Sequence, residues 1–267
     1  MPAEPLADSL CHYTTAEAAF AWILPSGELR LSPFSKMRDP FETGMSFMAS
    51  WYGERPDIEA RYAQATAALD RQRAGTKLLS FSIDAGPQHG YDASSGSFRL
   101  AWARARLWEQ YAEAHRGVCL AFDRKSAEAT IYGNLHELGV ANRGEVVYLP
   151  RGVRDTRART LMDTDLPSEG NFEALARYQT SHHTDLFLTK TLDWQSEHEF
   201  RFTVLRNYAE RDAHAFVRYE TALRAVIVGE RFPPELQRYA KAACERAGVE
   251  LLRMHWKDGF PWLLTME

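Results

Sequence analysis

The chain has few cysteines, no excess of basic charge and no long hydrophobic run. None of its stretches approaches eighteen consecutive apolar residues, and its acidic opening MPAEPLADSL contains prolines, so we expect neither a membrane span nor a signal peptide. The three cysteines are far apart and have no CxxC spacing, which argues against a disulfide framework or a cysteine zinc site. A formal net charge of -4 argues against general coating of nucleic acid. We therefore expect a cytoplasmic protein with core thiols.

The 267 residues are 45% hydrophobic and 25% charged, which supplies ample material for a core. Short alternating runs typical of strands are interspersed with segments of helical spacing along the whole chain. We predict one α+β domain over residues 1–267, with a central, mostly antiparallel or split β-sheet flanked by helices. The sequence does not indicate an oligomeric state.

The stretch DWQSEHEFRFTVL, residues 193–205, places two carboxylates two residues apart, at Glu197 and Glu199. In a strand, both would project to one face, and His198 and Phe200 to the other. Neighbouring carboxylates repel each other unless a cation or a ligand lies close by. Two interpretations stay open: a paired-acid site, or an exposed strand face on which Arg201 pairs with Glu199.

A strand, helix and strand pattern runs through residues 10–32, and His12, Tyr13 and Thr14 stand at the first strand's end. Thr14 with Glu17 reads as a capping box, so the helix should begin there. A helix N-terminus favours anions such as pyrophosphate. The alternatives are a histidine that fixes the strand end and a tyrosine that belongs to the core.

Further candidates lie on two other predicted elements. The strand of residues 77–83 should place Ser80 and Ser82 on one face, either as room for a planar ring or as the polar face of a half-buried strand. A helix over residues 104–115, closed by Gly117, carries Trp108 and Tyr111, an aromatic stripe that is typical of a core and, less often, of a ligand platform.

The remaining polar segments give weaker indications. Glu42 follows the Asp39-Pro40 turn, and we interpret it as a loop anchor rather than a substrate contact. We predict a surface helix over residues 56–74 and another over residues 171–190, whose His182 and His183 face different ways and have no third ligand, so we predict no metal site. Four arginines form a basic cluster, namely Arg151, Arg154, Arg157 and Arg159. This cluster is either a solvated loop or a contact to phosphate or nucleic acid.

Six separated segments, in this order, resemble the bacterial family DUF2971 over nearly the entire chain. They are CHYTTAEAAFAWILPSGELRLSPFSKMRDPFE, LSFS, RLWEQYAEAHRGVCLAFD, GEVVYL, KTLDWQSEHEFRF and RAVIVGERF. The chain departs from the family where Arg38 replaces the asparagine of Asn-Asp-Pro-Phe. The histidine and tyrosine ahead of a helix, the Ser-x-Ser strand and the late glutamate strand also look like the ADP-ribosyltransferase fold, and Glu197-His198-Glu199 looks like the Glu-x-Glu of arginine-type transferases.

That more distant resemblance implies an NAD-dependent ADP-ribosyltransferase-like enzyme, such as a toxin or phage-defence effector that modifies nucleic acid or protein. Glu199 would be the catalytic carboxylate, and Glu197 would orient or deprotonate the acceptor. The residues implied in NAD binding are His12, Tyr13, Thr14, Ser80, Ser82, Trp108 and Tyr111. Two alternatives remain: a non-catalytic module of the same fold that binds a nucleotide or a partner, and a metal-dependent nuclease that uses carboxylates such as Asp39 and Glu42.

Overall fold

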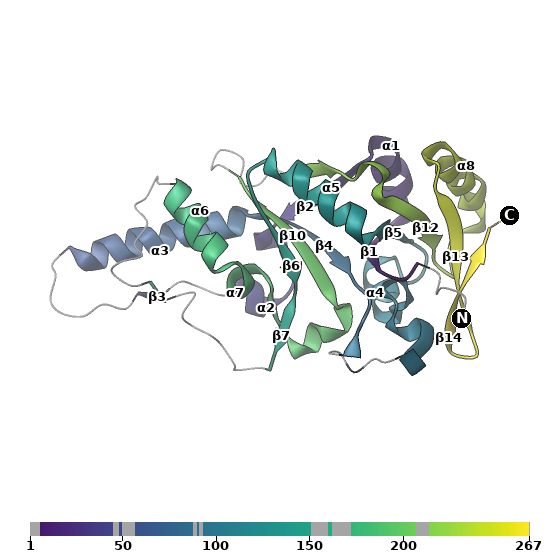
Figure 1. Ribbon diagram of the computed structural model, residues 1–267, viewed down its shortest axis with the longest axis horizontal. Coiled ribbons are helices and arrows are strands. Elements are labelled where there is room, and N and C mark those ends of the chain that lie inside the picture. The colour runs from purple at the N-terminus through teal and green to yellow at the C-terminus, as the bar shows by residue number, and fades with distance from the viewer. Residues whose placement is uncertain are drawn as a thin grey trace.

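The computed structural model describes residues 6–44, 48–49, 57–87, 90, 93–150, 160–161, 172–206 and 214–266. The fold is α+β, with helices packed around a large, mostly antiparallel sheet (Figure 1). The strands of this sheet are β1 (Ser9–Thr14), β2 (Glu28–Pro33), β4 (Lys77–Ser82), β5 (Val118–Asp123), β6 (Val140–Glu145), β10 (Glu199–Leu205), β11 (Ala215–Arg218), β12 (Leu223–Val228), β13 (Glu250–Lys257) and β14 (Phe260–Thr265).

The helices and the short strands complete the fold. The helices are α1 (Leu24–Ser26), which continues a π-helical turn (Ala18–Ile23), α2 (Pro40–Thr43), α3 (Ile58–Gly75), α4 (Ala105–Tyr111), α5 (Arg124–His136), α6 (Phe172–Ser181), α7 (His183–Phe187) and α8 (Gln237–Ala247). Two parallel pairs are formed by β3 (Met48–Ala49) with β8 (Thr160–Leu161) and by β7 (Val147–Leu149) with β9 (Thr189–Thr191).

The sheet splits at β4. Along one edge, β10 pairs with β4 from Glu199 opposite Ser82 to Val204 opposite Lys77, and β6 follows β10. Two strands pair with the other edge of β4: β1 pairs with it at Ser82, and β2 pairs with it at Leu78 and Lys77. From β1 the sheet continues through β5, β12, β13 and β14, and only the β12–β13 pairing is parallel. The predicted α+β fold with a mostly antiparallel sheet is confirmed.

The two faces of the sheet carry different cores. Leu79, Phe81 and Ile83 lie together, as predicted, in the larger core, which α5, α8 and the first helix cover. Trp102 and Trp108 close the opposite face over β1, β5 and β12. All three cysteines are buried and free, which confirms the expected core thiols.

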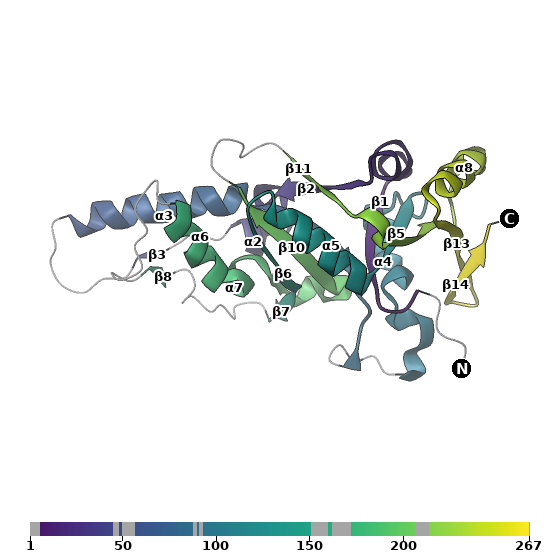
Figure 2. The same ribbon diagram turned by 45° about the horizontal axis from the view of Figure 1, so that its top comes forward.

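A third cluster extends the molecule to one side, where α3 projects beyond the sheet and α6 lies beside it (Figures 1 and 2). The helix predicted over residues 56–74 is confirmed as α3, and its apolar stripe is buried as the spacing requires, at Ile58, Tyr62, Ala65 and Leu69.

Two local predictions were wrong, and one strand was missed. The helix expected over residues 104–115 ends at Tyr111, because Glu113, Ala114 and His115 all have positive φ. The helix expected over residues 171–190 breaks near His182, and its last part forms strand β9. The strand β14 follows β13 and was not predicted.

Candidate functional site

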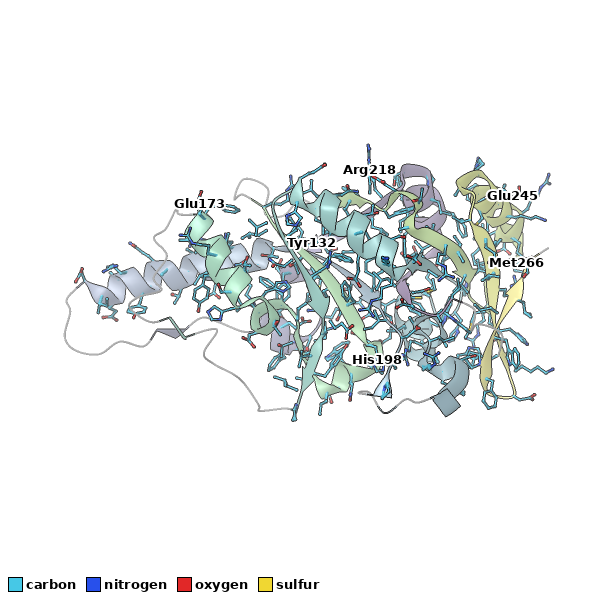
Figure 3. The ribbon with its side chains drawn as sticks, in the orientation of Figure 1. Tyr132, Glu173, His198, Arg218, Glu245 and Met266 are labelled. Atoms are coloured by element: carbon cyan, nitrogen blue, oxygen red, sulfur yellow. The ribbon has the colours of Figure 1, made fainter. Side chains whose placement is uncertain are left out.

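Glu197 and Glu199 converge, but through a turn rather than a strand pleat. A 3₁₀ helix (Leu192–Glu197) ends at Glu197, His198 adopts a left-handed conformation with φ 42 and ψ 61, and β10 begins at Glu199. His198 lies at this end of β10 in Figure 3. The predicted pleat was therefore wrong for Glu197 and His198, although the two carboxylates do share a site.

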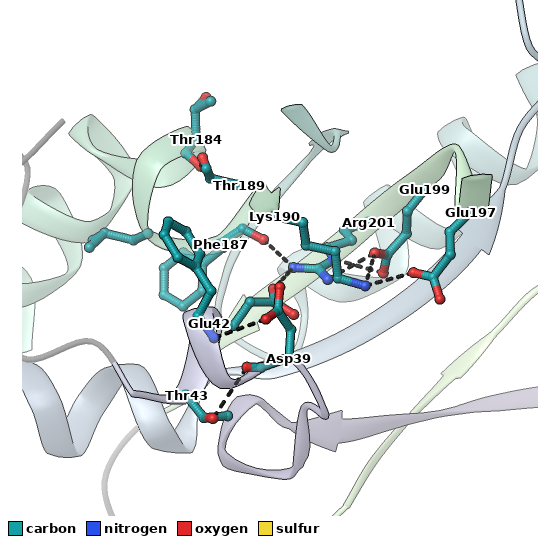
Figure 4. Close-up of polar contacts among 12 residues, drawn as sticks. Asp39, Glu42, Thr43, Thr184, Phe187, Thr189, Lys190, Glu197, Glu199 and Arg201 are labelled. Atoms are coloured by element: carbon teal, nitrogen blue, oxygen red, sulfur yellow. Dashed lines mark hydrogen bonds and ion pairs between the residues drawn. The ribbon is translucent and has the colours of Figure 1, made fainter. Parts of the chain in front are cut away.

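Lys190 is the cation that holds the pair together. Its Nζ lies 2.7 Å from Oε2 of Glu197 and 2.8 Å from Oε2 of Glu199 (Figure 4). All three side chains are buried. The site thus consists of two interior carboxylates that share one ammonium group, which removes most of their mutual repulsion.

Arg201 completes the network from inside the protein. Its Nε and Nη2 donate to the two oxygens of Glu199, at 2.7 and 2.8 Å, and its Nη1 donates to the carboxylate of Glu42 and to the carbonyl of Phe187. The predicted Glu199–Arg201 pair is confirmed, but the guanidinium is fully buried, so the interpretation as an exposed strand face was wrong. Glu42 anchors its loop, as predicted.

The network shifts the pKa values of its members. Burial alone would raise the pKa of Glu199, but the charges of Arg201 and Lys190 overcome this effect and lower it to about 2. For Glu42, burial outweighs the nearby guanidinium and raises the pKa. The pKa values of Lys190 and Arg201 are both raised: burial opposes their charges, and the neighbouring carboxylates prevail. Glu199 is therefore ionised at neutral pH.

Aromatic and cationic groups border the network. The Tyr111 hydroxyl donates to Oε1 of Glu197 at 2.9 Å, and Lys190 Nζ lies 5.1 Å from the ring centre of Trp194. Two exposed arginines lie over these rings, Arg38 over Tyr111 at 5.8 Å and Arg106 over Trp194 at 5.5 Å. Half-buried rings next to exposed cations suit a ligand that carries both an aromatic ring and negative charge.

Several of these contacts could not be found from the sequence. Lys190 and Trp194 were not predicted, and neither was Tyr148, whose hydroxyl accepts the backbone N–H of Glu199 at 2.9 Å. Trp194 did offer a signal, since it lies three residues before Glu197. Ser82, which was predicted, fixes the same turn by donating its hydroxyl to the Glu197 carbonyl at 2.8 Å.

The other predicted aromatic residues lie in the core. Trp108 is fully buried, and its Nε1 donates to the Trp102 carbonyl at 2.8 Å. The Tyr13 ring packs edge-on against Trp108, and its hydroxyl donates to the Ala101 carbonyl at 2.7 Å. Trp108 and Tyr13 thus pack in the core, and of the predicted aromatic pair Trp108 and Tyr111 only Tyr111 bonds a carboxylate of the site.

His12 lies on the opposite face of the sheet from the carboxylates. Cys11, Ser82 and Glu199 are cross-strand partners and share a face, so the side chain of His12 points the other way. Its Nδ1 donates to the Ser80 carbonyl at 3.0 Å, and burial lowers the pKa of the ring. Ser80 itself shares the face of Arg201, its cross-strand partner.

The helix N-terminus after β1 already has an anionic partner. The cap is Thr15, whose Oγ1 accepts the Ala18 N–H at 3.0 Å, so the capping box predicted with Thr14 was wrong. The Ala16 N–H donates to the carboxylate of Glu113 at 2.9 Å. A side chain of the protein thus satisfies the position at which we expected pyrophosphate.

The remaining expectations concern metals and charged loops. Among the residues that the structure describes, no group of three His, Cys, Asp or Glu side chains is arranged to hold a metal ion. His183 is buried and bonds Thr203 through Nε2 at 2.8 Å. The arginine cluster of residues 151–159 lies outside the described residues. No helix in the described ranges is long and apolar enough to cross a membrane.

Comparison with known proteins gives one family match. Residues 107–202 match the model of a family described as protein of unknown function (DUF2971). This segment runs from α4 into β10 and contains the whole Tyr111, Lys190, Glu197, Glu199 and Arg201 part of the site. Searches of curated proteins and of solved structures found no match.

Proposed function

We propose that the protein is an NAD-dependent ADP-ribosyltransferase that uses the Glu197 and Glu199 pair. The observation that carries this proposal is the pair itself: two buried carboxylates on one lysine, next to Tyr111 and Trp194. The split sheet and the glutamate at the start of β10 agree with the resemblance in the sequence. The exposed Arg38 and Arg106 supply cations for the pyrophosphate of NAD.

The chemistry needs a fixed negative charge beside the nicotinamide ribose. When the bond between the ribose C1′ and nicotinamide breaks, nicotinamide leaves with the bonding electrons and the sugar becomes cation-like. The acceptor then bonds to C1′ and loses a proton, which a second carboxylate can accept. The two glutamates of the site can divide these tasks.

The contacts favour Glu197 as the carboxylate that meets the substrate. Both oxygens of Glu199 are held by Arg201, and one is also held by Lys190, so its charge is largely offset. Glu197 is held by one cation and by the neutral hydroxyl of Tyr111. We therefore assign Glu199, the residue favoured by the sequence, to positioning Lys190 and thereby Glu197.

The test is incubation of the purified protein with labelled NAD, with and without nucleic acid and cell extract. We expect Glu197→Gln to reduce nicotinamide release and label transfer by at least ~100-fold, because removing one group that stabilises transition-state charge has effects of this order. Glu145→Gln is the matched control, because Glu145 lies on β6 in an exposed pair with Arg124. Equal activity of wild type and Glu197→Gln would refute the proposal.

A second function, non-catalytic binding of a nucleotide, is favoured by one observation. Both oxygens of Glu199 and both of its cations are already paired within the protein, so this carboxylate has a structural role that requires no catalysis. This alternative predicts that NAD or a related nucleotide binds and is not cleaved.

A further inference from the structure

The hairpin of β13 and β14 exposes a face of aromatic and basic side chains. Phe260, Trp262 and Leu264 are 56%, 55% and 50% exposed, and they alternate along β14, so they share one face. On β13 their direct cross-strand partners are Lys257, His255 and Arg253. Each apolar side chain of this hairpin face therefore lies beside a basic one.

This face does not belong to the cores. The neighbouring residues of the same strands, such as Trp256 and Leu263, point to the opposite side and pack against the cluster that contains Trp102. Met266, beyond the end of β14, packs against the core beneath α8 (Figure 3). Phe98 extends the apolar surface, since its ring lies 5.3 Å from that of Phe260.

The free edge of β14 is poorly suited to another strand. Within the described part of the chain, β14 pairs only with β13. The Met266 N–H donates to the Leu251 carbonyl. In an antiparallel pair, every second residue bonds to the partner strand, so the backbone groups of Leu264, Trp262 and Phe260 also point toward β13. The backbone groups of the intervening residues point outward. One of the outward residues is Pro261, which has no N–H to donate. A partner must therefore use the side chains of the hairpin face.

The charges on this face are suited to phosphate. Glu230 engages His255, with its Oε1 3.1 Å from the ring Nδ1. Lys257 is exposed and lies beside Phe260 at the hairpin end, whereas Nε and Nη2 of Arg253 are buried and have no hydrogen-bond partner among the described residues. Exposed rings offer a stacking surface for unpaired bases, and neighbouring cations meet the backbone between them.

We propose that the hairpin face binds single-stranded nucleic acid. One base stacks on Phe260 and one on Trp262, while the exposed Lys257 contacts a phosphate. Duplex DNA fits less well, because its bases are stacked on each other and unavailable to the rings. The proposal concerns binding, so it stands whether or not the Glu197 site transfers ADP-ribose; if it does, the hairpin indicates a nucleic-acid acceptor.

The experiment measures fluorescence anisotropy of labelled oligo-dT and oligo-U of about 20 nucleotides, with a duplex of the same length for comparison. The full chain and its Phe260→Ala/Trp262→Ala variant are titrated against each. We expect the single strands to bind more tightly than the duplex, and the double variant to weaken that binding at least ~10-fold. Lys257→Gln should lower the salt dependence by about one phosphate contact.

Two control variants separate this proposal from its alternatives. Trp22→Ala removes another highly exposed tryptophan, on the first helix, and should bind like wild type. Glu197→Gln should also keep wild-type affinity for the oligonucleotides, so failure of the proposed catalysis and failure of this surface are distinguishable. The proposal is overturned if no single strand binds, if Trp22→Ala loses as much affinity as the double variant, or if the hairpin residues alter only concentration-dependent self-association.

Discussion

Replacing Glu199 with glutamine tests the ion network at its centre. The change keeps the shape of the side chain and removes the charge that Arg201 and Lys190 share. Among the residues that the structure describes, Arg201 then retains Glu42 as its ionic partner, and Lys190 retains Glu197. Breaking a buried pair leaves an uncompensated charge, so we expect the free energy of unfolding to fall by about 3 kcal/mol or more at neutral pH.

The pH dependence provides an independent measure of the same interaction. The folded pKa of Glu199 is about 2, against an ordinary value of 4.5. Because the folded value is depressed, this stabilisation is fully present above the unfolded pKa and is lost as the pH falls toward the folded one. The shift corresponds to about 3 kcal/mol. The difference between wild type and Glu199→Gln should therefore shrink as the pH falls below about 4.5.

Urea unfolding of both proteins, from neutral pH down to the lowest pH at which wild type folds, measures this difference. Glu145→Gln again serves as the control, since the Glu145 side chain is 45% exposed and lies 2.7 Å from Arg124. An exposed pair contributes at most about 1 kcal/mol. The reasoning is refuted if Glu199→Gln costs no more than Glu145→Gln, or if its cost is the same at every pH.

Three further predictions concern other parts of the chain. Tyr111→Phe removes a hydrogen bond to a carboxylate and should lower the free energy of unfolding by about 1.5 kcal/mol, whereas unchanged urea unfolding would show that this bond contributes nothing. Gly229→Ala should destabilise by more than about 2 kcal/mol, because a Cβ would lie 2.1 Å from the His115 carbonyl oxygen, while Gly133→Ala, in open space within α5, should stabilise by up to about 1 kcal/mol. Thermal melts that rank these glycine variants the other way would contradict the packing. Burial, followed by the charge of Arg201, lowers the pKa of His183 to about 4. The unfolded state therefore takes up the proton first, and the free energy of unfolding falls as the pH drops from about 6.5 toward 4. An NMR titration of His183 with a midpoint near 6.5 would disprove this.

The sequence predicts those features of the fold that depend on short-range patterns. Alternation in residues 77–83 gave a strand whose apolar face is in the core, and helical spacing gave α3. The pairing of Glu199 with Arg201 followed from their separation of two residues in a strand. These predictions succeed because the pleat and the helical turn fix side-chain directions locally.

Other features depend on contacts between distant segments. Lys190 continues a helical pattern, but it lies in β9 because that strand pairs with β7. Glu113, Ala114 and His115, after α4, have left-handed conformations although none of them is glycine, so the sequence gives no sign of them. They are held by tight packing, with Gly229 against the carbonyl of His115 and Gly117 against that of Thr14. No single-residue preference encodes such an arrangement.

The directions of two predicted site residues follow from the sequence alone. His12 and Tyr13 are consecutive residues of a strand, so their side chains point to opposite faces of the sheet. Applied to Glu197, the same rule failed, because His198 takes a left-handed conformation that ends the 3₁₀ helix before the strand begins.

The proposed function requires that the Glu197 site bind NAD. Titration calorimetry with NAD, on wild type and on Trp194→Ala, tests this most directly, since the Trp194 ring borders Lys190 without bonding either glutamate. We expect saturable binding to wild type that weakens at least ~5-fold in the variant, because a stacking ring is lost. Absence of NAD binding to folded wild type would contradict it.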